Sequence, residues 1–221
     1  MSRRILRPCR PALIASILLG VAAQAGAQDL SVVTVLAPGS GCALGHDENV
    51  VIRLFNYGMP LPAGTTFSVA YAINAGTPVF ESVVLGTSLL TDSTFTYTFT
   101  TQANLAIPGT YDFDATVSLA GDINPGNDAF HGHAVTNSAP SVGGTLSASS
   151  VPSSSGTLTL SGVTGDVMQW EESDDGLRWY ALANTTMTQD YAGLRASTQF
   201  RARVRNADCN DAVSDTVTVS P

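Results

Sequence analysis

The sequence contains no lysine, and ten arginines stand against 18 acidic residues. Four of the arginines lie within the first ten residues, so residues 28–221 carry a net charge of −12. Nucleic acids and anionic membrane surfaces attract proteins through clustered positive charge. A chain with so few cations is therefore not expected to bind either of them.

Long apolar runs are missing too, since none after residue 27 approaches the roughly 20 residues that a membrane span needs. Residues 1–27 join an arginine-rich start to a short apolar run, ALIASILLGVAAQ, and end in Ala25-Gly26-Ala27. This order predicts a secretory signal peptide that is cleaved after Ala27, by the general rather than the twin-arginine route. The protein is then secreted or at the cell surface, with the periplasm as an alternative, and is not inserted in a membrane.

Motifs of catalysis are absent from the sequence. It holds neither G-x-S-x-G nor H-E-x-x-H. Carboxylates do occur in WEES and SDDG, but a glycosidase needs two of them facing each other across a cleft. We therefore predict a protein that is not an enzyme and needs no cofactor.

Cysteine is scarce: once the leader with Cys9 is removed, only Cys42 and Cys209 remain. In an exported protein such a pair suggests a disulfide. The two residues, however, belong to different predicted domains, one near the start and one near the end. Two separate thiols are the favoured interpretation, and a Cys42–Cys209 bridge is the alternative.

From residue 29 onward the hydrophobic pattern has a period of two. In YDFDATVSL, Tyr111, Phe113 and Val117 alternate with polar residues, and VVIRLF, FSVAYAI and TFTYTFT behave in the same way. This alternation predicts half-buried antiparallel strands, and turn residues such as NAGTP and NPGND separate them. Many short strands at this spacing indicate β-sandwiches.

A cluster of small and turn-forming residues, TNSAPSVGGT, interrupts the strands at residues 136–145. A second strand series follows it, with TLTL, VMQWEES, LRWYAL, TQFRARVR and DTVTVS. We predict a signal peptide over 1–27 and two tandem immunoglobulin-like β-sandwiches, over 28–138 and 139–221.

Residues 29–137 resemble the bacterial Ig-like modules related to the cell-adhesion-related domain of bacteria, CARDB. The resemblance rests on GCALGHDENVVIRLFNYG, on TFTYTFTTQANLAIPGTYDF and on SLAGDINPGNDAF, in that order. Residues 139–221 resemble other Ig-like or fibronectin-type repeats of secreted bacterial proteins, through WEESDDGLRWYAL and DYAGLRASTQFRARV. Phe200 stands where an aromatic hydroxyl is common in such repeats. Both resemblances imply a spacer or a binding module at a bacterial surface.

The segment GDINPGNDAF, residues 121–130, is rich in calcium-type ligands. As an EF-hand it fails, because Gly126 and His133 stand where an oxygen ligand and a bidentate glutamate are needed. A looser Ca²⁺ site is the alternative, whereas Asn-Pro-Gly followed by Asn-Asp favours a plain turn. The candidate metal ligands are Asp122, Asn124, Asn127 and Asp128.

The motif HGH places His131 and His133 on one strand face, about 7 Å apart at the strand rise. Zinc or copper binding would need a third ligand, for which Asp128 or His46 is a candidate. Histidines at the surface or on an edge strand, with no metal, are the favoured interpretation.

The motif RARVR sets three arginines on one strand face, and two tryptophans flank the turn at SDDG earlier in the sequence. Guanidinium groups bind acidic sugars or sulfates, but they also pair internally with acids such as Glu171, Glu172, Asp174 and Asp175 or stack on aromatic rings, and we favour internal pairing. Trp170 shares the strand phase of Met168 and is expected in the core, while Trp179 is freer. The candidate ligand-binding residues are Trp179, Tyr180, Arg201, Arg203 and Arg205.

Together these features predict a secreted, non-enzymatic protein that acts in adhesion, display or extracellular structure. Its partner would be a protein or a polysaccharide at a cell surface, recognised from the side, at the loop ends or by strand addition. The alternative is a carbohydrate-binding accessory module that uses the aromatic and arginine face.

Overall fold

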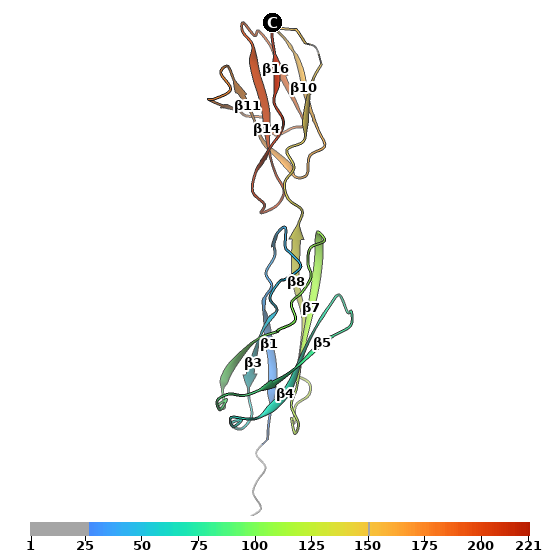
Figure 1. Ribbon diagram of the computed structural model, residues 1–221, viewed down its shortest axis with the longest axis vertical. Helices are drawn as coiled ribbons and strands as arrows, with labels where there is room; N and C mark the ends of the chain where they lie inside the picture. The colour runs from blue at the N-terminus through green and yellow to red at the C-terminus, as the bar shows by residue number, and fades with distance from the viewer. Residues whose placement is uncertain (1–26, 150) are drawn as a thin grey trace, which may run out of the picture.

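The computed structural model describes residues 27–149 and 151–221, and β-strands are the only regular elements in them. No helix in these residues could cross a membrane. The predicted leader lies outside the described residues, apart from Ala27. Figure 1 shows two β-sandwiches stacked end to end, which confirms the predicted all-β, Ig-like architecture.

The first sandwich is built from two sheets. One has the strand order β1-β3-β6, and the other has the order β2-β8-β7-β4-β5, in which β2 runs parallel to β8 and the other pairs are antiparallel. The strands are β1 Leu30–Ala37, β2 Gly41–Cys42, β3 Val51–Asn56, β4 Thr66–Ile73, β5 Val79–Val84, β6 Ser93–Thr98, β7 Gly109–Ser118 and β8 Ala129–Ser138.

Alternation along the strands fills the space between these sheets. Along β7 the buried residues are Phe113, Ala115 and Val117, as the period-two pattern predicts, with exposures of 0%, 1% and 3%. Ile52 and Leu54 of β3 enter the same core from the opposite sheet and are fully buried. Apolar residues at every second position thus join the two sheets.

One edge of this sandwich is closed by the carboxylate of Glu81 on β5. It accepts hydrogen bonds from the Tyr97 hydroxyl at 2.6 Å, from the Thr100 hydroxyl at 2.7 Å and from the Thr101 N–H at 2.9 Å. Burial raises the pKa of Glu81, but these hydrogen bonds outweigh burial and lower that pKa to about 2. An inward-pointing charge on an edge strand also discourages pairing with another chain.

The second sandwich also has two sheets, with the strand orders β13-β10-β9 and β12-β11-β14-β15, and β16 pairs with β14. All of its strand pairs are antiparallel. The strands are β9 Thr145–Ala148, β10 Gly156–Ser161, β11 Asp166–Ser173, β12 Tyr180–Leu182, β13 Thr188–Tyr191, β14 Thr198–Arg205, β15 Ala212–Val213 and β16 Val217–Val219.

Trp170 is the largest side chain of the second core and is fully buried, as predicted. Its indole N–H donates to the Thr186 carbonyl at 2.9 Å. The reason given for its burial was wrong, because Met168 is 45% exposed. A register shift between Val167 and Gln169 breaks the alternation on β11, so Met168 and Trp170 do not share a phase.

The connection between the sandwiches is short and closely packed. β8 ends at Ser138 and β9 begins at Thr145. A Cβ on Gly143 would meet the Val213 carbonyl oxygen at 2.1 Å, so glycine is needed for this close approach. The division into 28–138 and 139–221 stays a prediction, and these parts are called the first and second module below.

Candidate functional site

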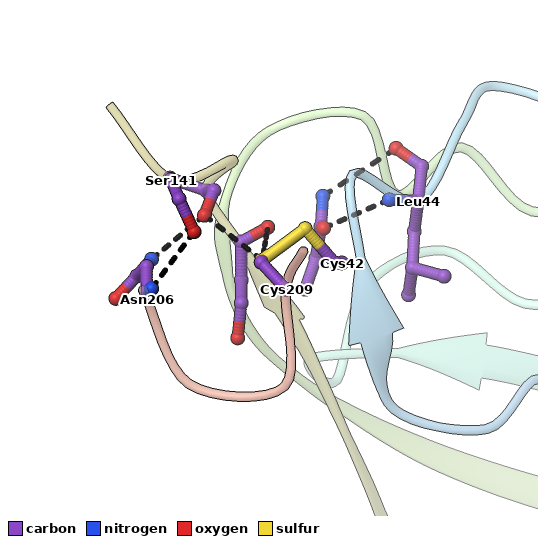
Figure 2. Close-up of a disulfide and its surroundings, with 8 residues drawn as sticks. Cys42, Leu44, Ser141, Asn206 and Cys209 are labelled. Atoms are coloured by element: carbon purple, nitrogen blue, oxygen red, sulfur yellow. Dashed lines mark hydrogen bonds between the residues drawn. A yellow bond between two sulfur atoms is a disulfide. The ribbon is translucent and has the colours of Figure 1, made fainter. Parts of the chain in front are cut away.

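A disulfide joins Cys42 to Cys209 across the two modules (Figure 2). The favoured prediction of two separate thiols was therefore wrong. Cys42 ends β2, beside the last residues of β8, and Cys209 lies in the turn between β14 and β15. Each cysteine thus sits at the end of its module that faces the other, with the two Cα atoms 5.1 Å apart.

Hydrogen bonds surround this disulfide at the joint between the modules. The Asn206 side chain donates to the Ala139 carbonyl at 2.7 Å, and the Asn206 backbone N–H donates to the Ser141 hydroxyl at 2.9 Å (Figure 2). On the other side the Ala43 N–H donates to the Ser138 carbonyl at 3.0 Å. The linker is therefore tied to both modules, and the joint has two covalent connections.

The three arginines of β14 do share one face, and carboxylates hold them. Arg201 Nε lies 2.6 Å from Glu171 Oε2, and Arg203 Nη1 lies 3.6 Å from the other oxygen of that carboxylate. Arg203 Nη2 also lies 2.9 Å from Asp211, which Arg205 contacts as well. We call these five residues the arginine ladder.

Glu171 is the buried anchor of the arginine ladder, with only 5% exposure. Burial raises the pKa of its carboxyl, but hydrogen bonds from Arg201 and Gln169, together with the charges of Arg201 and Arg203, hold the pKa below its usual value. Of the other predicted partners, Asp175 instead accepts hydrogen bonds from the backbone N–H groups of Leu177 and Arg178.

The candidate ligand-binding residues do not form one surface. Arg201 stacks on Trp179, with its guanidinium carbon 3.9 Å from the ring centroid. Tyr180 is opposite Glu172 in the sheet, and Glu172 is opposite the core residue Phe200. Tyr180 therefore points to the other face of the sheet, away from the arginines, where it is 59% exposed.

The loop at residues 121–128 is a turn that is tied to the start of the chain. Asp122 Oδ1 accepts from the Asn124 N–H at 2.8 Å, and its Oδ2 accepts from the Leu30 N–H at 2.8 Å. The Asn127 amide donates to Asp29 at 2.8 Å. Among the described residues, no hydrogen bond joins the Asn124 side chain to Asp128.

Two acceptor atoms of this loop, Asn127 Oδ1 and Asp128 Oδ1, are buried without a hydrogen-bond partner among the described residues. Burial raises the pKa of Asp128, and the nearby charges of Asp122 and Asp29 raise it further. No group of three or more His, Cys, Asp or Glu side chains able to hold a metal ion is found within residues 27–149 and 151–221. The loop thus concentrates negative charge at this end of the first module.

The two histidines of HGH have separate partners. His131 Nδ1 lies 2.9 Å from Asp114, and His133 Nε2 lies 2.8 Å from the Pro38 carbonyl oxygen. A register shift opposite Gly132, whose φ is +83°, separates their environments. They do not converge on one ligand.

Asp211 is a member of the arginine ladder that the sequence interpretation missed. The sequence could have predicted it, because NADCND is a turn-like segment between two strands. A turn there brings Asp211 back beside Arg203 and Arg205. No local sequence pattern predicts that Asp29 and Tyr57 lie close to the 121–128 loop. These segments are up to 98 residues apart and meet only through the fold.

Comparison with known proteins finds several similar solved structures. It is similar to the solution structure of the CARDB domain of PF1109 from Pyrococcus furiosus, with 20% identity over 50% of this chain and 95% of that one and a TM-score of 0.36. A crystal structure of that domain in complex with di-metal ions is 18% identical over 50% and 88% of the two chains, with a TM-score of 0.32. Both are structures of the domain type that the motifs of residues 29–137 resemble.

A tetra-tandem repeat from the extending region of a large adhesion protein is also similar, with 12% identity over 89% of this chain and 50% of that one and a TM-score of 0.35. Residues 142–220 match a family described as a domain of unknown function, DUF8696. The match covers most of the second module. No curated protein matches the sequence.

Proposed function

We propose that this is a secreted, non-enzymatic protein that acts in adhesion or display at a cell surface as a stiff two-module rod. The observation that carries the proposal is the Cys42–Cys209 disulfide at the joint. A single linker between two sandwiches allows relative motion of the modules by default. A second covalent connection, backed by the hydrogen bonds of Asn206, opposes bending at that point.

A stiff joint suits a protein that must present one end at a distance from the other. The far ends of the two sandwiches point in opposite directions along the long axis (Figure 1). Disulfides persist in oxidising compartments outside the cytoplasm. The bridge therefore also supports the export that the leader sequence predicts.

The alternative, a carbohydrate-binding module, would use the aromatic and arginine face of the second module. Here the contacts are less favourable, because Arg201 covers one face of Trp179 and Glu171 and Asp211 already pair with the arginines. A sugar acid would have to compete with both carboxylates. We therefore favour a protein at the cell surface as the partner.

The decisive experiment is co-sedimentation of the secreted protein with intact bacterial cells and, separately, with insoluble polysaccharides. We expect it to sediment with cells, and we expect Trp179→Ala to sediment equally well. Sedimentation with polysaccharide that is lost in Trp179→Ala would establish the alternative. Binding to neither material would remove adhesion and leave an extracellular structural role.

A further inference from the structure

Three segments far apart in sequence meet at the end of the first module that is remote from the joint. Residues 27–29 lie between the chain after β3 and the turn at 121–128. The Tyr57 N–H donates to the Asp29 carbonyl at 2.8 Å, the Gly58 N–H donates to the same carbonyl at 3.1 Å, and the Ile123 N–H donates to the Gln28 carbonyl at 2.9 Å. Backbone hydrogen bonds therefore fix the relative positions of side chains from all three segments.

This end exposes large apolar side chains from two of these segments. Tyr57 is 56% exposed, Met59 is 54% exposed and Ile123 is 65% exposed. Two hollows, of about 480 and 360 Å³, adjoin here and share Asp29 and Tyr57 in their walls. Ala27 lines the smaller one, so the predicted cleavage after Ala27 would remove part of that wall. Apolar groups gathered around hollows mark a binding surface more than isolated exposed residues do.

The charged group that lines both hollows is the carboxylate of Asp29. Asn127 lines the larger one, and in the adjoining loop the buried oxygens Asn127 Oδ1 and Asp128 Oδ1 have no donor among the described residues. No arginine forms an ion pair with Asp29, Asp122 or Asp128 in the described part of the chain. The first module holds nine acidic residues and a single arginine, Arg53. A ligand that brings positively charged donors is therefore the complement of this surface.

We propose that this end of the first module, formed by Asp29, Tyr57, Met59, Ile123 and Asn127, binds a segment of a partner protein in which lysine or arginine adjoins aliphatic side chains. The cation meets Asp29 and the face of Tyr57, and the aliphatic groups cover Met59 and Ile123. The inference rests on the proposed adhesion function and assigns the chemistry of its partner. A second copy of this chain is disfavoured as the occupant because its first module carries the same negative charge.

The test is fluorescence polarisation with three labelled hexapeptides of the sequences LRLRLR, SRSRSR and LELELE. The protein is the secreted form, with its N-terminus read by mass spectrometry. We expect LRLRLR to bind most tightly, SRSRSR more weakly and LELELE not at all. Tyr57→Ala should weaken LRLRLR about five-fold, and Asp29→Asn and Ile123→Ser should weaken it by a similar factor.

Two matched controls lie in the same module and away from this surface. Ile107→Ala removes an aliphatic side chain that is 76% exposed, and Asp47→Asn removes one exposed negative charge. Neither should change the affinity for LRLRLR. Amide signals outside the three segments, recorded by NMR, show that each variant is folded.

Three results would overturn the assignment. Equal weakening by the control variants would mean that net charge alone attracts the peptide, and absence of binding would remove the site. A rise in melting temperature with Ca²⁺ that Asp29→Asn abolishes, without peptide binding, would assign the acceptors to a cation. If the protein sediments with cells but binds no peptide, only this site is disproved. If it binds the peptide but does not sediment with cells, the adhesion proposal is disproved.

Discussion

The two modules carry the same number of acidic residues but hold them differently. Each has nine, while the first module has one arginine and the second has five. In the first module, Glu81 is held by hydroxyl and backbone N–H donors, and Asp122 by backbone N–H groups alone. In the second module, arginines hold Glu171 and Asp211.

Neutral donors and guanidinium groups stabilise a carboxylate in different ways. A hydroxyl or an N–H satisfies its oxygens but leaves its charge uncancelled, whereas an arginine cancels the charge as well. The first module therefore keeps a net charge of −8 and the second only −4. The surface of the first module therefore attracts cations, whereas the charged residues of the second module pair mainly with one another.

The largest expected effect comes from removing the disulfide, because that bridge acts on both modules. In the oxidised protein, residues 139–209 form a closed loop when the second module unfolds, and this loop limits the entropy of the unfolded chain. The double variant Cys42→Ser and Cys209→Ser removes this restriction. We expect the free energy of unfolding of each module to fall by about 4 kcal/mol. Urea unfolding followed by tryptophan fluorescence reports the second module, which holds both tryptophans, and hydrogen exchange in β4 and β7 reports the first.

The same double variant tests the stiffness of the joint. Small-angle scattering should show a broader distribution of molecular lengths than for the oxidised protein. An unchanged distribution would show that the hydrogen bonds of Asn206 suffice, and would remove the disulfide from the proposed function.

Glu171→Gln should have the next largest effect, and only in the second module. It leaves two arginines beside a neutral amide, and breaking a buried ion pair costs about 3 kcal/mol. Urea unfolding followed by tryptophan fluorescence measures this loss in the free energy of unfolding. Glu172→Gln is the matched control, since Glu172 makes no ion pair among the described residues, and its effect should stay within about 0.5 kcal/mol. Equal effects of both would mean that the arginine ladder does not anchor the sheet.

Glu81→Gln is the counterpart in the first module and should cost about 2 kcal/mol near neutral pH, measured by hydrogen exchange in β4. The pKa of Glu81 is lowered from 4.5 to about 2 by folding. Its stabilisation is therefore complete above about pH 4.5 and is lost as the pH falls towards 2. The difference between wild type and variant should shrink over this range. A difference that is constant down to pH 2.5 would contradict the role given to the carboxylate.

Trp179→Ala should have the smallest effect, about 1 kcal/mol in the second module, because the half-buried ring contributes one cation–π contact to Arg201. Urea unfolding followed by the remaining Trp170 measures it. A loss of 3 kcal/mol or more would place Trp179 in the folding core instead.

Local patterns predicted most of the fold, because side-chain alternation is a property of neighbouring residues. Phe113, Ala115 and Val117 are buried as the pattern of YDFDATVSL indicates. The interpretation of Met168 failed because a single bulge in β11 reverses which residues alternate toward the core. That bulge depends on the pairing of β11 with β14, which the local pattern does not contain. RARVR was likewise interpreted correctly as an amphipathic strand, with Ala202 and Val204 fully buried.

The contacts between distant segments could not be predicted in this way. Cys42 and Cys209 are 167 residues apart, and their meeting depends on which end of each sandwich faces the joint. Nothing near either cysteine encodes that orientation. The surface around Asp29, Tyr57 and Ile123 has the same origin, because it forms only when the fold brings the start of β1, the end of β3 and the turn after β7 together.

The position of the disulfide also sets how far the molecule can be stretched. A pull on the two ends of the described chain reaches Cys42 from one side and Cys209 from the other. Once the outer segments have straightened, tension passes through the sulfur atoms, and unfolding between these residues cannot lengthen the molecule. The strands that lie wholly outside that covalent loop are β1, β15 and β16, and force can detach these from their sheets. A shear stress at a surface would therefore detach the outermost strands, and the disulfide would set an upper limit on the length of the stretched molecule.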